Sequence, residues 1–276
     1  MRFMKLEICG QDYICGQASE CPCPQDIKLL CDRRLGIGAD GFFIIRRNEP
    51  ENARIFAFNS SGELHADLIT SSFCGILKLF IDSNVSHCIF SDDSDSVNVF
   101  ISDFDGRHGM VSGDLGAVLF TARRQDIATG APLIDAPVEV GNRILKMSCC
   151  YLAGVKAVHI AGDLGALKCE QLGGKITRHS LFQKRADAVF CEKTAPQTLY
   201  VRLFRNSGGE ALCDIAGAAA AAACACRNGI TEFSREIKIT MPGGDIYVLC
   251  DRDYGVMATA QADFIFSGDT AAQVFC

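Results

Sequence analysis

The chain has 276 residues, of which 49% are hydrophobic, and it carries a formal net charge of −6 with a pI near 5.4. This length and apolar content are sufficient for one large domain or two domains of ordinary size. The negative charge excludes an electrostatic case for binding nucleic acid or an anionic membrane.

The sequence also argues against a membrane-spanning segment. Its longest apolar run, AGAAAAAACAC at residues 216–226, is far shorter than the roughly 20 residues that cross a bilayer. The first residues lack the long apolar stretch and the cleavage site of a signal peptide. We therefore expect a cytoplasmic protein with no membrane partner.

Sixteen cysteines are scattered through apolar contexts, which is typical of free buried thiols. The one dense patch is Cys21–Pro24, near Cys15 and Cys31, and it lacks the second well-spaced pair of a zinc site. We expect reduced structural thiols and no metal.

Short alternating or apolar runs bounded by Gly, Asp, Asn or Pro predict β-strands. The predicted strands are residues 2–9, 41–47, 53–58, 97–101, 117–122, 199–204, 236–241, 246–250 and 263–268. Apolar residues at helical spacing predict a helix at 68–83. An alanine-rich stretch predicts a second helix from 215, which Asn228-Gly229 should end.

One ten-residue phrase occurs twice, as NSSGELHADL at 59–68 and as NSGGEALCDI at 206–215. Each copy lies between a predicted strand and a predicted helix, so Asp67 and Asp214 fall where the helices begin. A repeat with so long a period indicates a duplicated domain rather than a solenoid. The sequence therefore predicts two similar α/β halves, each with many strands and one main helix.

Several motifs resemble those of the diaminopimelate epimerases, and the resemblance runs nearly end to end. Residues 31–45, CDRRLGIGADGFFII, resemble their Gly-Ile-Gly-Ala-Asp segment, and residues 8–13, ICGQDY, resemble their Gly-Asn-Asp-Phe with Gln11 in place of Asn. Residues 241–248, MPGGDIYV, are similar to their late Pro-Gly-Gly stretch, and residues 204–223 follow their second catalytic segment without a gap.

The resemblance implies an α+β fold with two pseudo-symmetric domains, each a β-sheet wrapped around a central α-helix. The active site of the family lies in the cleft between the two domains. The expected boundaries are residues 1–118 plus 263–276 for the N-terminal half-domain and residues 119–262 for the C-terminal half-domain.

The family also implies a mechanism. Each repeated phrase of the family carries a cysteine at the N-terminus of its central helix. One thiol takes the α-proton and the other returns a proton to the opposite face, without pyridoxal phosphate or metal. Backbone N–H groups of the helix N-termini hold the substrate carboxylate, here at Ile215, Ala216 and Gly217. The resemblance therefore implies a cofactor-independent isomerase.

This chain departs from the family at the catalytic positions. Asp214 occupies the second cysteine position, with Cys213 directly before it. The internal repeat places Asp67 in the first position, whereas a gap-free comparison with the family places Leu68 there. We prefer Asp67, because the repeat aligns ten residues without a gap. Most glycines of the family's helix N-termini are also replaced, which argues against diaminopimelate as the substrate.

The remaining expected substrate contacts are side chains. These are Gln11, Asn59, Asp187, Arg205 and Asn206. Asn59 matches a substrate contact of the family, and Arg205-Asn206 falls on its Glu-Arg pair, yet both asparagines are also typical turn residues. Glu63 and Glu210 are expected to brace the loop rather than react.

Two carboxylates facing one cleft, within about 10 Å of each other, would make an acid/base pair. Their proximity should raise the pKa of at least one of them, leaving one protonated and one ionised. Because a carboxylate is a weaker base than a thiolate, the substrate should be a more acidic carbon acid. Two reactions are then alternatives: a racemisation, or a 1,3-proton shift as in the related phenazine-biosynthesis isomerases. A mixed site that uses Cys213 instead of an aspartate pair is a further alternative.

A second hypothesis is a catalytically inactive relative that binds a ligand or partners an active subunit. Asp is a preferred N-cap, worth about 0.5–2 kcal/mol, and its charge would oppose a substrate carboxylate at the helix N-terminus. An Asp214→Asn change is expected to abolish turnover of an active enzyme at little cost in stability. The expected partner is a small amino or carboxylic acid, and the oligomeric state is open, a homodimer included.

Overall fold

The computed structural model describes residues 1–17, 22–64, 68–120, 127–128, 130–183, 185–206 and 209–270. The chain divides into two compact units, Met1–Asp114 with Thr259–Cys276, and Leu115–Ala258. None of the helices in these described ranges combines the length and the apolar character needed to cross a membrane.

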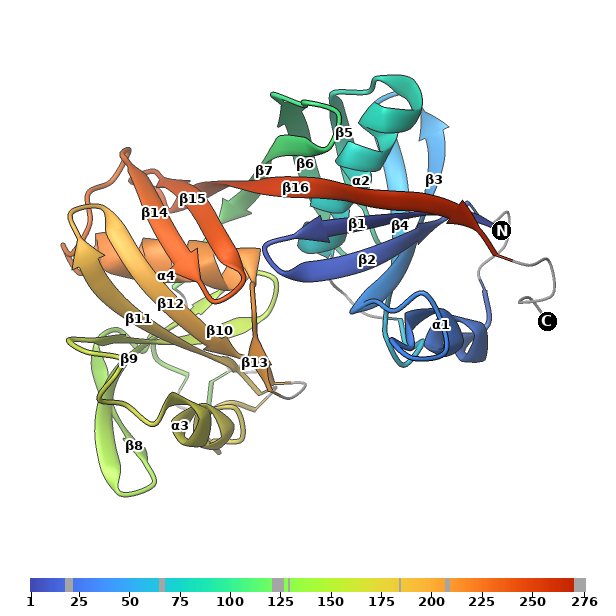
Figure 1. Cartoon of the computed structure of the whole chain (residues 1–276). Helices are drawn as coiled ribbons and strands as arrows, with labels where there is room; N and C mark the ends of the chain where they lie inside the picture. Colours follow the sequence, from blue (N-terminus) through green and yellow to red (C-terminus); the bar gives the residue numbers. More distant parts are fainter. Residues whose placement is uncertain are drawn as a thin grey trace. The chain divides into compact units, whose positions relative to one another are not determined.

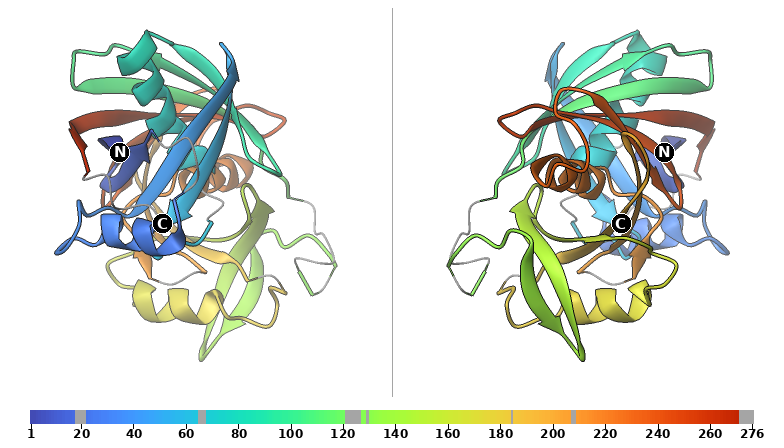
Figure 2. Two further views of the ribbon diagram at one scale, coloured as in Figure 1. Left: turned by 90° about the vertical axis from the view of Figure 1, so that its right-hand side faces the viewer. Right: turned by 90° about the vertical axis from the view of Figure 1, so that its left-hand side faces the viewer.

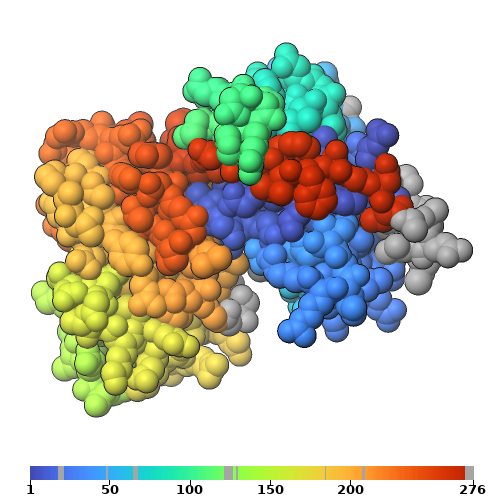
Figure 3. Space-filling model, in the orientation of Figure 1, coloured from blue at the N-terminus to red at the C-terminus, as the bar shows by residue number. Residues whose placement is uncertain are grey.

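The first unit is a ring of strands around a helix (Figure 1). Its strands are β1 (Arg2–Ile8), β2 (Gln11–Gly16), β3 (Gly41–Glu49), β4 (Asn52–Asn59), β5 (His87–Ser91), β6 (Ser96–Ser102), β7 (His108–Ala117) and most of β16 (Gly255–Asp269). They pair in the order β1 to β7 and then β16, and β16 pairs with β1, which closes the ring. The end of β16 lies on the surface, red in Figure 3, where Ile265 and Phe266 are exposed.

Helix α2 (Leu68–Ser83) is the central helix of this unit, since it contacts β1, β2, β4, β5 and β6. Helix α1 (Pro24–Cys31) covers the outer face of the sheet near β3 (Figure 2). Pro24 stands at the first turn of α1, where its missing N–H costs nothing.

The second unit has the same plan. Its strands are β8 (Ala136–Val140), β9 (Arg143–Tyr151), β10 (Val155–Ala161), β11 (Asp187–Ala195), β12 (Thr198–Phe204), β13 (Glu210–Ala211), β14 (Glu236–Met241) and β15 (Gly244–Cys250). They pair in the order β15-β14-β12-β11-β10-β9-β8, with β13 beside β12. Helix α4 (Ile215–Arg227) contacts β9, β10, β11, β12, β14 and β15, while α3 (Cys169–Ile176) contacts β8, β11 and β12.

The two units repeat one topology, as the duplicated phrase predicts. In the first, antiparallel β1 and β2 lead through α1 to β3, which is parallel to β2, and β4 leads through α2 to β5, which is parallel to β4. In the second, β9 and β10 lead through α3 to β11, and β12 leads through α4 to β14, with the same parallel pairings. Each repeated phrase therefore connects the fourth strand of this pattern to the central helix.

Helix α4 owes its central place to its small side chains. All residues from Ile215 to Cys226 are buried, and most are alanine, the strongest helix former. Because each alanine adds only a methyl group, strands can pack closely around the helix. It ends at Arg227, and after the C-cap Asn228 comes Gly229, whose φ of 66° is the left-handed conformation typical of a helix stop.

One strand prediction is wrong for those of its residues that the structure describes. Residues 117–122 were expected to form a strand, but β7 ends at Ala117 and Leu119 makes only an isolated bridge with Tyr151. These apolar residues instead belong to a connecting segment. The N–H of Val118 donates to the carbonyl of Tyr254, and the ring of Phe120 lies 4.8 Å from that of Tyr254.

Candidate functional site

Asp214 immediately precedes α4 and caps it. Its Oδ1 accepts the N–H of Gly217 at 2.7 Å, and its Oδ2 accepts from Nε of Arg205 at 3.4 Å. A Cβ at Gly217 would lie 2.1 Å from a methyl carbon of Leu203, so the first turn of α4 packs closely against β12.

Lys156 is a functional candidate that sequence reasoning missed. It lies on β10, directly opposite Asp187 in the parallel pairing with β11. Its Nζ donates to Oδ2 of Asp187 at 2.6 Å, and its side chain is only 3% exposed. The signal in the sequence is a lysine inside an apolar strand, VKAVHIA.

Four of the predicted site residues come together around this lysine. Asp187 pairs with Lys156, and its other carboxylate oxygen accepts the N–H of Asn206 at 2.8 Å. Arg205 contacts Asp214, and its Nη2 also donates to the carbonyl of Cys213 at 3.3 Å. The result is a cluster of two cations and two carboxylates at the N-terminus of α4, which we call the α4 cluster: Lys156, Asp187, Arg205 and Asp214.

The electrostatics of the α4 cluster keep Asp214 ionised. Burial by itself would raise the pKa of Asp214, but Lys156 and Arg205 outweigh it and hold that pKa below its usual range. Burial likewise opposes the charge of Lys156, yet Asp214 and Asp187 raise the pKa of the ammonium. Asp214 is therefore not the carboxylate of raised pKa, and the expectation that at least one of Asp67 and Asp214 has a raised pKa stays a prediction for Asp67.

The other residues near α4 are buried. Cys213 is fully buried, and Ile215 and Ala216 are 1% and 7% exposed. The N–H of Gly217 already donates to Asp214. Binding of a substrate carboxylate by the N–H groups of Ile215, Ala216 and Gly217 stays a prediction.

In the first unit, Gln11 begins β2 and is 5% exposed. Its Oε1 is buried and has no hydrogen-bond partner among the described residues. A buried acceptor of this kind is costly unless something binds it. The role of Gln11 as a substrate contact, which the resemblance implies, stays a prediction.

Asn59 forms a turn. Its side-chain oxygen accepts the N–H groups of Ser61 and Glu63, both at 3.0 Å, and its amide donates to the Glu63 carboxylate at 2.9 Å. Glu210 of the second phrase accepts instead from Arg202, at 2.6 and 2.8 Å. Both glutamates hydrogen-bond locally, as expected of residues that brace the loop.

Asp67 lies outside the described residues, and α2 is described from the buried Leu68 onward. The pairing of Asp67 with Asp214, their separation and the choice between Asp67 and Leu68 therefore stay predictions.

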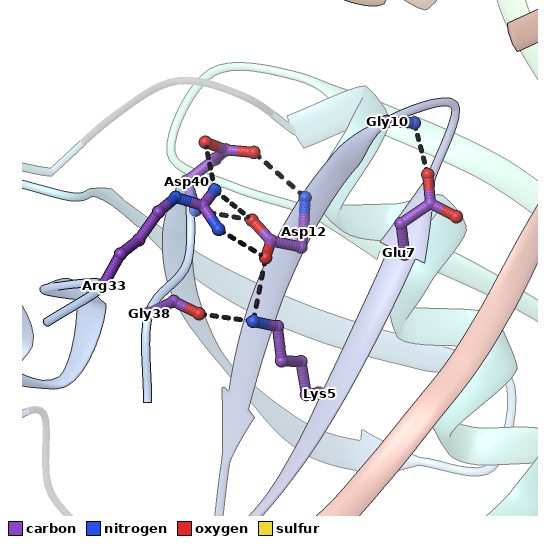
Figure 4. Close-up of polar contacts among 7 residues, drawn as sticks. All are labelled: Lys5, Glu7, Gly10, Asp12, Arg33, Gly38 and Asp40. Atoms are coloured by element: carbon purple, nitrogen blue, oxygen red, sulfur yellow. Dashed lines mark hydrogen bonds and ion pairs between the residues drawn. The ribbon is translucent and has the colours of Figure 1, made fainter. Parts of the chain in front are cut away.

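A second ionic cluster lies beside Gln11 (Figure 4). Asp12 and Asp40 each accept the other's backbone N–H, at 3.0 and 3.1 Å. Nη2 of Arg33 donates to both carboxylates, at 2.7 and 2.9 Å, and Nζ of Lys5 lies 2.9 Å from Asp12. These contacts fasten the Gly-Ile-Gly-Ala-Asp loop to the start of β2.

The described residues contain no group of three or more His, Cys, Asp or Glu placed to hold a metal ion. Of the fourteen cysteines that the structure describes, all except Cys23 are buried. Two hollows of the first unit, of about 490 and 360 Å³, lie toward the C-terminal end of α2, where Asp82 lines both. None of the residues predicted to bind substrate lines either hollow.

No family model matches the chain. It is 26% identical over 277 residues to the diaminopimelate epimerase of Acetivibrio thermocellus, covering 98% of each chain. It is 25% identical over 283 residues to the diaminopimelate epimerase of Moorella thermoacetica, covering 98% of this chain and 99% of that one.

Solved structures share the fold at lower identity. A hydroxyproline epimerase from Agrobacterium vitis, with bound trans-4-hydroxy-L-proline, matches with a TM-score of 0.70 at 11% identity, covering 100% of this chain and 92% of that one. A phenazine biosynthesis protein of the PhzF family from Bacillus anthracis matches with a TM-score of 0.66 at 11% identity, covering 98% and 99%. A methylitaconate-delta-isomerase matches with a TM-score of 0.63 at 13% identity, covering 97% and 95%.

The relatives and structural neighbours are thus epimerases, isomerases and a phenazine biosynthesis protein. The chain has the α+β diaminopimelate epimerase-like fold, in which each unit wraps a β-sheet around a central helix, and it resembles the diaminopimelate epimerases over nearly its whole length.

Proposed function

We propose that the protein is a cofactor-independent isomerase that moves a proton on a small amino or carboxylic acid other than diaminopimelate. The reaction is a racemisation, an epimerisation or a 1,3-proton shift. The observation that carries this proposal is Asp214, an ionised carboxylate at the position where the resembling epimerases have a catalytic cysteine. The likeness to epimerases over the full length supports it.

In the proposed mechanism Asp214 accepts the proton from the substrate carbon, and the resulting negative charge passes to the substrate as an enolate. A second acid then protonates the enolate at the opposite face or at a conjugated carbon. We assign this second role to Asp67, which the internal repeat places in register with Asp214. Gln11, Asn59, Asp187, Arg205 and Asn206, with the first turn of α4, are the proposed substrate contacts.

A second candidate function is an inactive relative that binds a ligand or an active subunit. One observation favours it: the Asp214 carboxylate already accepts the N–H of Gly217 and is paired with Arg205. A carboxylate held in this way can serve as a helix cap alone.

Proton–deuterium exchange separates the two functions. The protein is incubated in heavy water with proline, hydroxyproline, glutamate, diaminopimelate, itaconate and glutaconate, and deuterium at carbon is followed by NMR. An isomerase exchanges at least one of these acids, and Asp214→Asn removes that exchange. The matched control is Asp135→Asn, a half-exposed aspartate of the same unit that pairs with Lys146 and should leave exchange unchanged.

Exchange is expected with itaconate or glutaconate, whose C–H bond is acidified by an alkene. If no acid exchanges, while a diaminopimelate epimerase exchanges its own substrate under the same conditions, the isomerase proposal is wrong and the inactive relative is favoured.

A further inference from the structure

The smaller of the two hollows in the first unit has charged walls, and we call it the charged hollow. Its volume of about 360 Å³ lies within the usual range for small-ligand sites, about 300–1,000 Å³. The paired start of β1 and end of β16 (Figure 1) form one side of it, and the last turns of α2 form another. Its polar lining residues are Arg2, Gln17, Lys78, Asp82, Ser267 and Asp269.

The least exposed charge in the charged hollow is Lys78. It stands in a stretch of α2 that is buried from Leu68 to Leu79, and its side chain is only 8% exposed. It forms an ion pair with Asp82, one turn further along the same face of the helix, whose side chain is 27% exposed. Burying an ammonium group carries a large desolvation cost, and replacing a buried ion pair by apolar residues is often neutral or stabilising. Stability alone therefore does not account for a lysine here.

A second ion pair lies at the outer edge of the charged hollow. Arg2 and Asp269 are register partners across β1 and β16, their Nε and Oδ1 atoms lie 4.0 Å apart, and their side chains are 71% and 72% exposed. Gln17 and Ser267 add an amide and a hydroxyl, which can each donate and accept hydrogen bonds. The charged hollow thus presents two cations and two carboxylates, with no net charge.

This charge balance selects the class of ligand. A simple anion would meet Lys78 and Arg2 but also two carboxylates, and a simple cation would meet the reverse. A zwitterion can pair each of its groups with the opposite charge, and hydrogen bonds between charged groups are the strong ones. Asp82 belongs to the last turn of α2, where the partial negative charge of the helix end also favours a cation. The ammonium of a ligand is therefore expected at Asp82 and its carboxylate at Lys78 and Arg2.

We propose that the charged hollow is a binding site for a small free amino acid, separate from the proposed isomerase site. Asp82 lies 14 residues after Leu68, which puts about 21 Å of helix between the charged hollow and the N-terminal end of α2, where the first catalytic position is expected. A small amino acid cannot contact both ends. The proposal therefore does not depend on the isomerase function, and a binding measurement tests it directly.

For the test, ¹⁵N-labelled protein is titrated at pH 7 with glycine, alanine, serine, valine and proline, and the backbone amide signals are followed by NMR. At least one of these amino acids should shift the signals of residues 2–4, 17, 82 and 267–269 in a saturable way. Propionate and ethylamine carry the two charges of alanine one at a time. Each should bind at least about tenfold more weakly than the best of the five amino acids, because it loses a charge-assisted hydrogen bond.

Variants locate the binding. The double variant Lys78→Met/Asp82→Asn removes both charges of the inner pair, so that neither is left uncompensated, and it should abolish the saturable shifts. Arg2→Gln changes an exposed side chain and should weaken binding about two- to fivefold, which decides the question if the double variant does not fold. Lys28→Met, at an exposed lysine of α1 in the same unit, is the matched control and should bind as the parent does. Asp214→Asn should also retain the shifts, because it lies at the proposed isomerase site.

Saturable shifts that persist in the double variant, or that are absent from the residues lining the charged hollow, overturn the proposal. Binding of propionate or ethylamine as tight as that of the amino acids overturns it too, because the site would then recognise a single charge. Shifts confined to residues around α4 would mark ligand binding at the proposed isomerase site, which would support that function and overturn the charged hollow as a second site.

Discussion

Asp214 does two things at the start of α4, since it caps the helix and compensates two cations. Asparagine can perform only the first of these. The side-chain oxygen of an asparagine would still accept the N–H of Gly217, but Arg205 would lose this ion pair and Lys156 would lose one of the carboxylates that favour its charge. The α4 cluster therefore makes Asp214→Asn more costly than capping alone implies.

We expect Asp214→Asn to lower the free energy of unfolding by about 1–3 kcal/mol at pH 7, because a partner of buried charges is lost. Because the folded-state pKa of Asp214 is lowered, this contribution is fully present above the ordinary aspartate pKa and disappears as the pH falls through the folded value. Urea unfolding of the variant and its parent should therefore differ most at neutral pH and converge in acid.

The half-exposed Asp135 provides the control for that measurement. Its φ of 43° suits asparagine as well as aspartate, and its ion pair with Lys146 is solvated. Asp135→Asn should change stability by no more than about 0.5 kcal/mol at any pH. Equal effects of the two substitutions would show that Asp214 is an ordinary surface charge.

The residues of the site illustrate what a sequence can and cannot indicate. The repeated phrase identifies Asp214, because a duplicated aspartate before a helix is visible in one dimension. Lys156 was missed, because its partner Asp187 becomes its neighbour only through the parallel pairing of β10 and β11. The lowered pKa of Asp214 depends on Lys156 as well as on Arg205, so the sequence did not predict it.

Two helical glycines show how the packing of an element decides the effect of a methyl group. Gly217 in the first turn of α4 faces Leu203, whose methyl carbon would lie 2.1 Å from an added Cβ. Gly174 in α3 faces open space, with nothing within 4 Å of an added Cβ. Helix propensity alone would favour alanine at both positions by up to about 1 kcal/mol.

We therefore expect opposite signs from the same substitution. Gly217→Ala should destabilise the protein by about 1–3 kcal/mol through overpacking, and Gly174→Ala should stabilise it by about 0.5–1 kcal/mol. Thermal unfolding of the two variants checks this. Stabilisation by both would mean that the Leu203 side chain can shift away from an added methyl group without cost.

The cluster of Asp12, Asp40, Arg33 and Lys5 fastens a loop rather than a helix. Burial opposes the charge of Asp12, but hydrogen bonds from Arg33 and Lys5 outweigh it and lower the pKa of Asp12. Burial leaves the pKa of Asp40 raised. The charge of Asp12 is therefore stabilising in the folded state, whereas the charge of Asp40 carries a cost.

At pH 7 we expect Asp12→Asn to destabilise the protein by about 1–3 kcal/mol, and Asp40→Asn to cost less, because an asparagine oxygen can still accept the N–H of Asp12. The penalty of Asp12→Asn should begin to shrink below the ordinary aspartate pKa and disappear as the pH falls through the lowered folded-state pKa of Asp12. Chemical unfolding from pH 7 to acid measures both. A larger penalty for Asp40→Asn would reverse the assignment.

The elements themselves were predicted unevenly. The bounds of α2 and β14 are those expected from the sequence, because long periodic runs determine them. Helices α1 and α3 were not predicted, since eight residues give barely two turns of periodicity. The apolar run after Ala117 was mistaken for a strand, because the pairing of Leu119 with Tyr151 is limited to one isolated bridge.

At the scale of the molecule, one strand, β16, is shared by the two units. β16 begins at Gly255, within the second unit, and ends at Asp269, within the first, so its residues belong to both. It pairs with β15 on one side of the strand order and with β7 and β1 on the other. Loss of this strand would open the ring around α2 and remove one of the two neighbours of β15.

The labelling of buried thiols during unfolding tests whether the two units unfold together. Cys74 lies in α2 and Cys224 in α4, and both are fully buried, so N-ethylmaleimide can label them only after unfolding. We expect peptide mapping by mass spectrometry to show both cysteines becoming labelled at one urea midpoint, because β16 couples the two sheets. Cys23, which is not fully buried, should label without urea and serves as the control for reagent access. Labelling of Cys224 at a urea concentration that still protects Cys74, or the reverse, would mean that each unit unfolds independently and that the shared strand does not couple their stabilities.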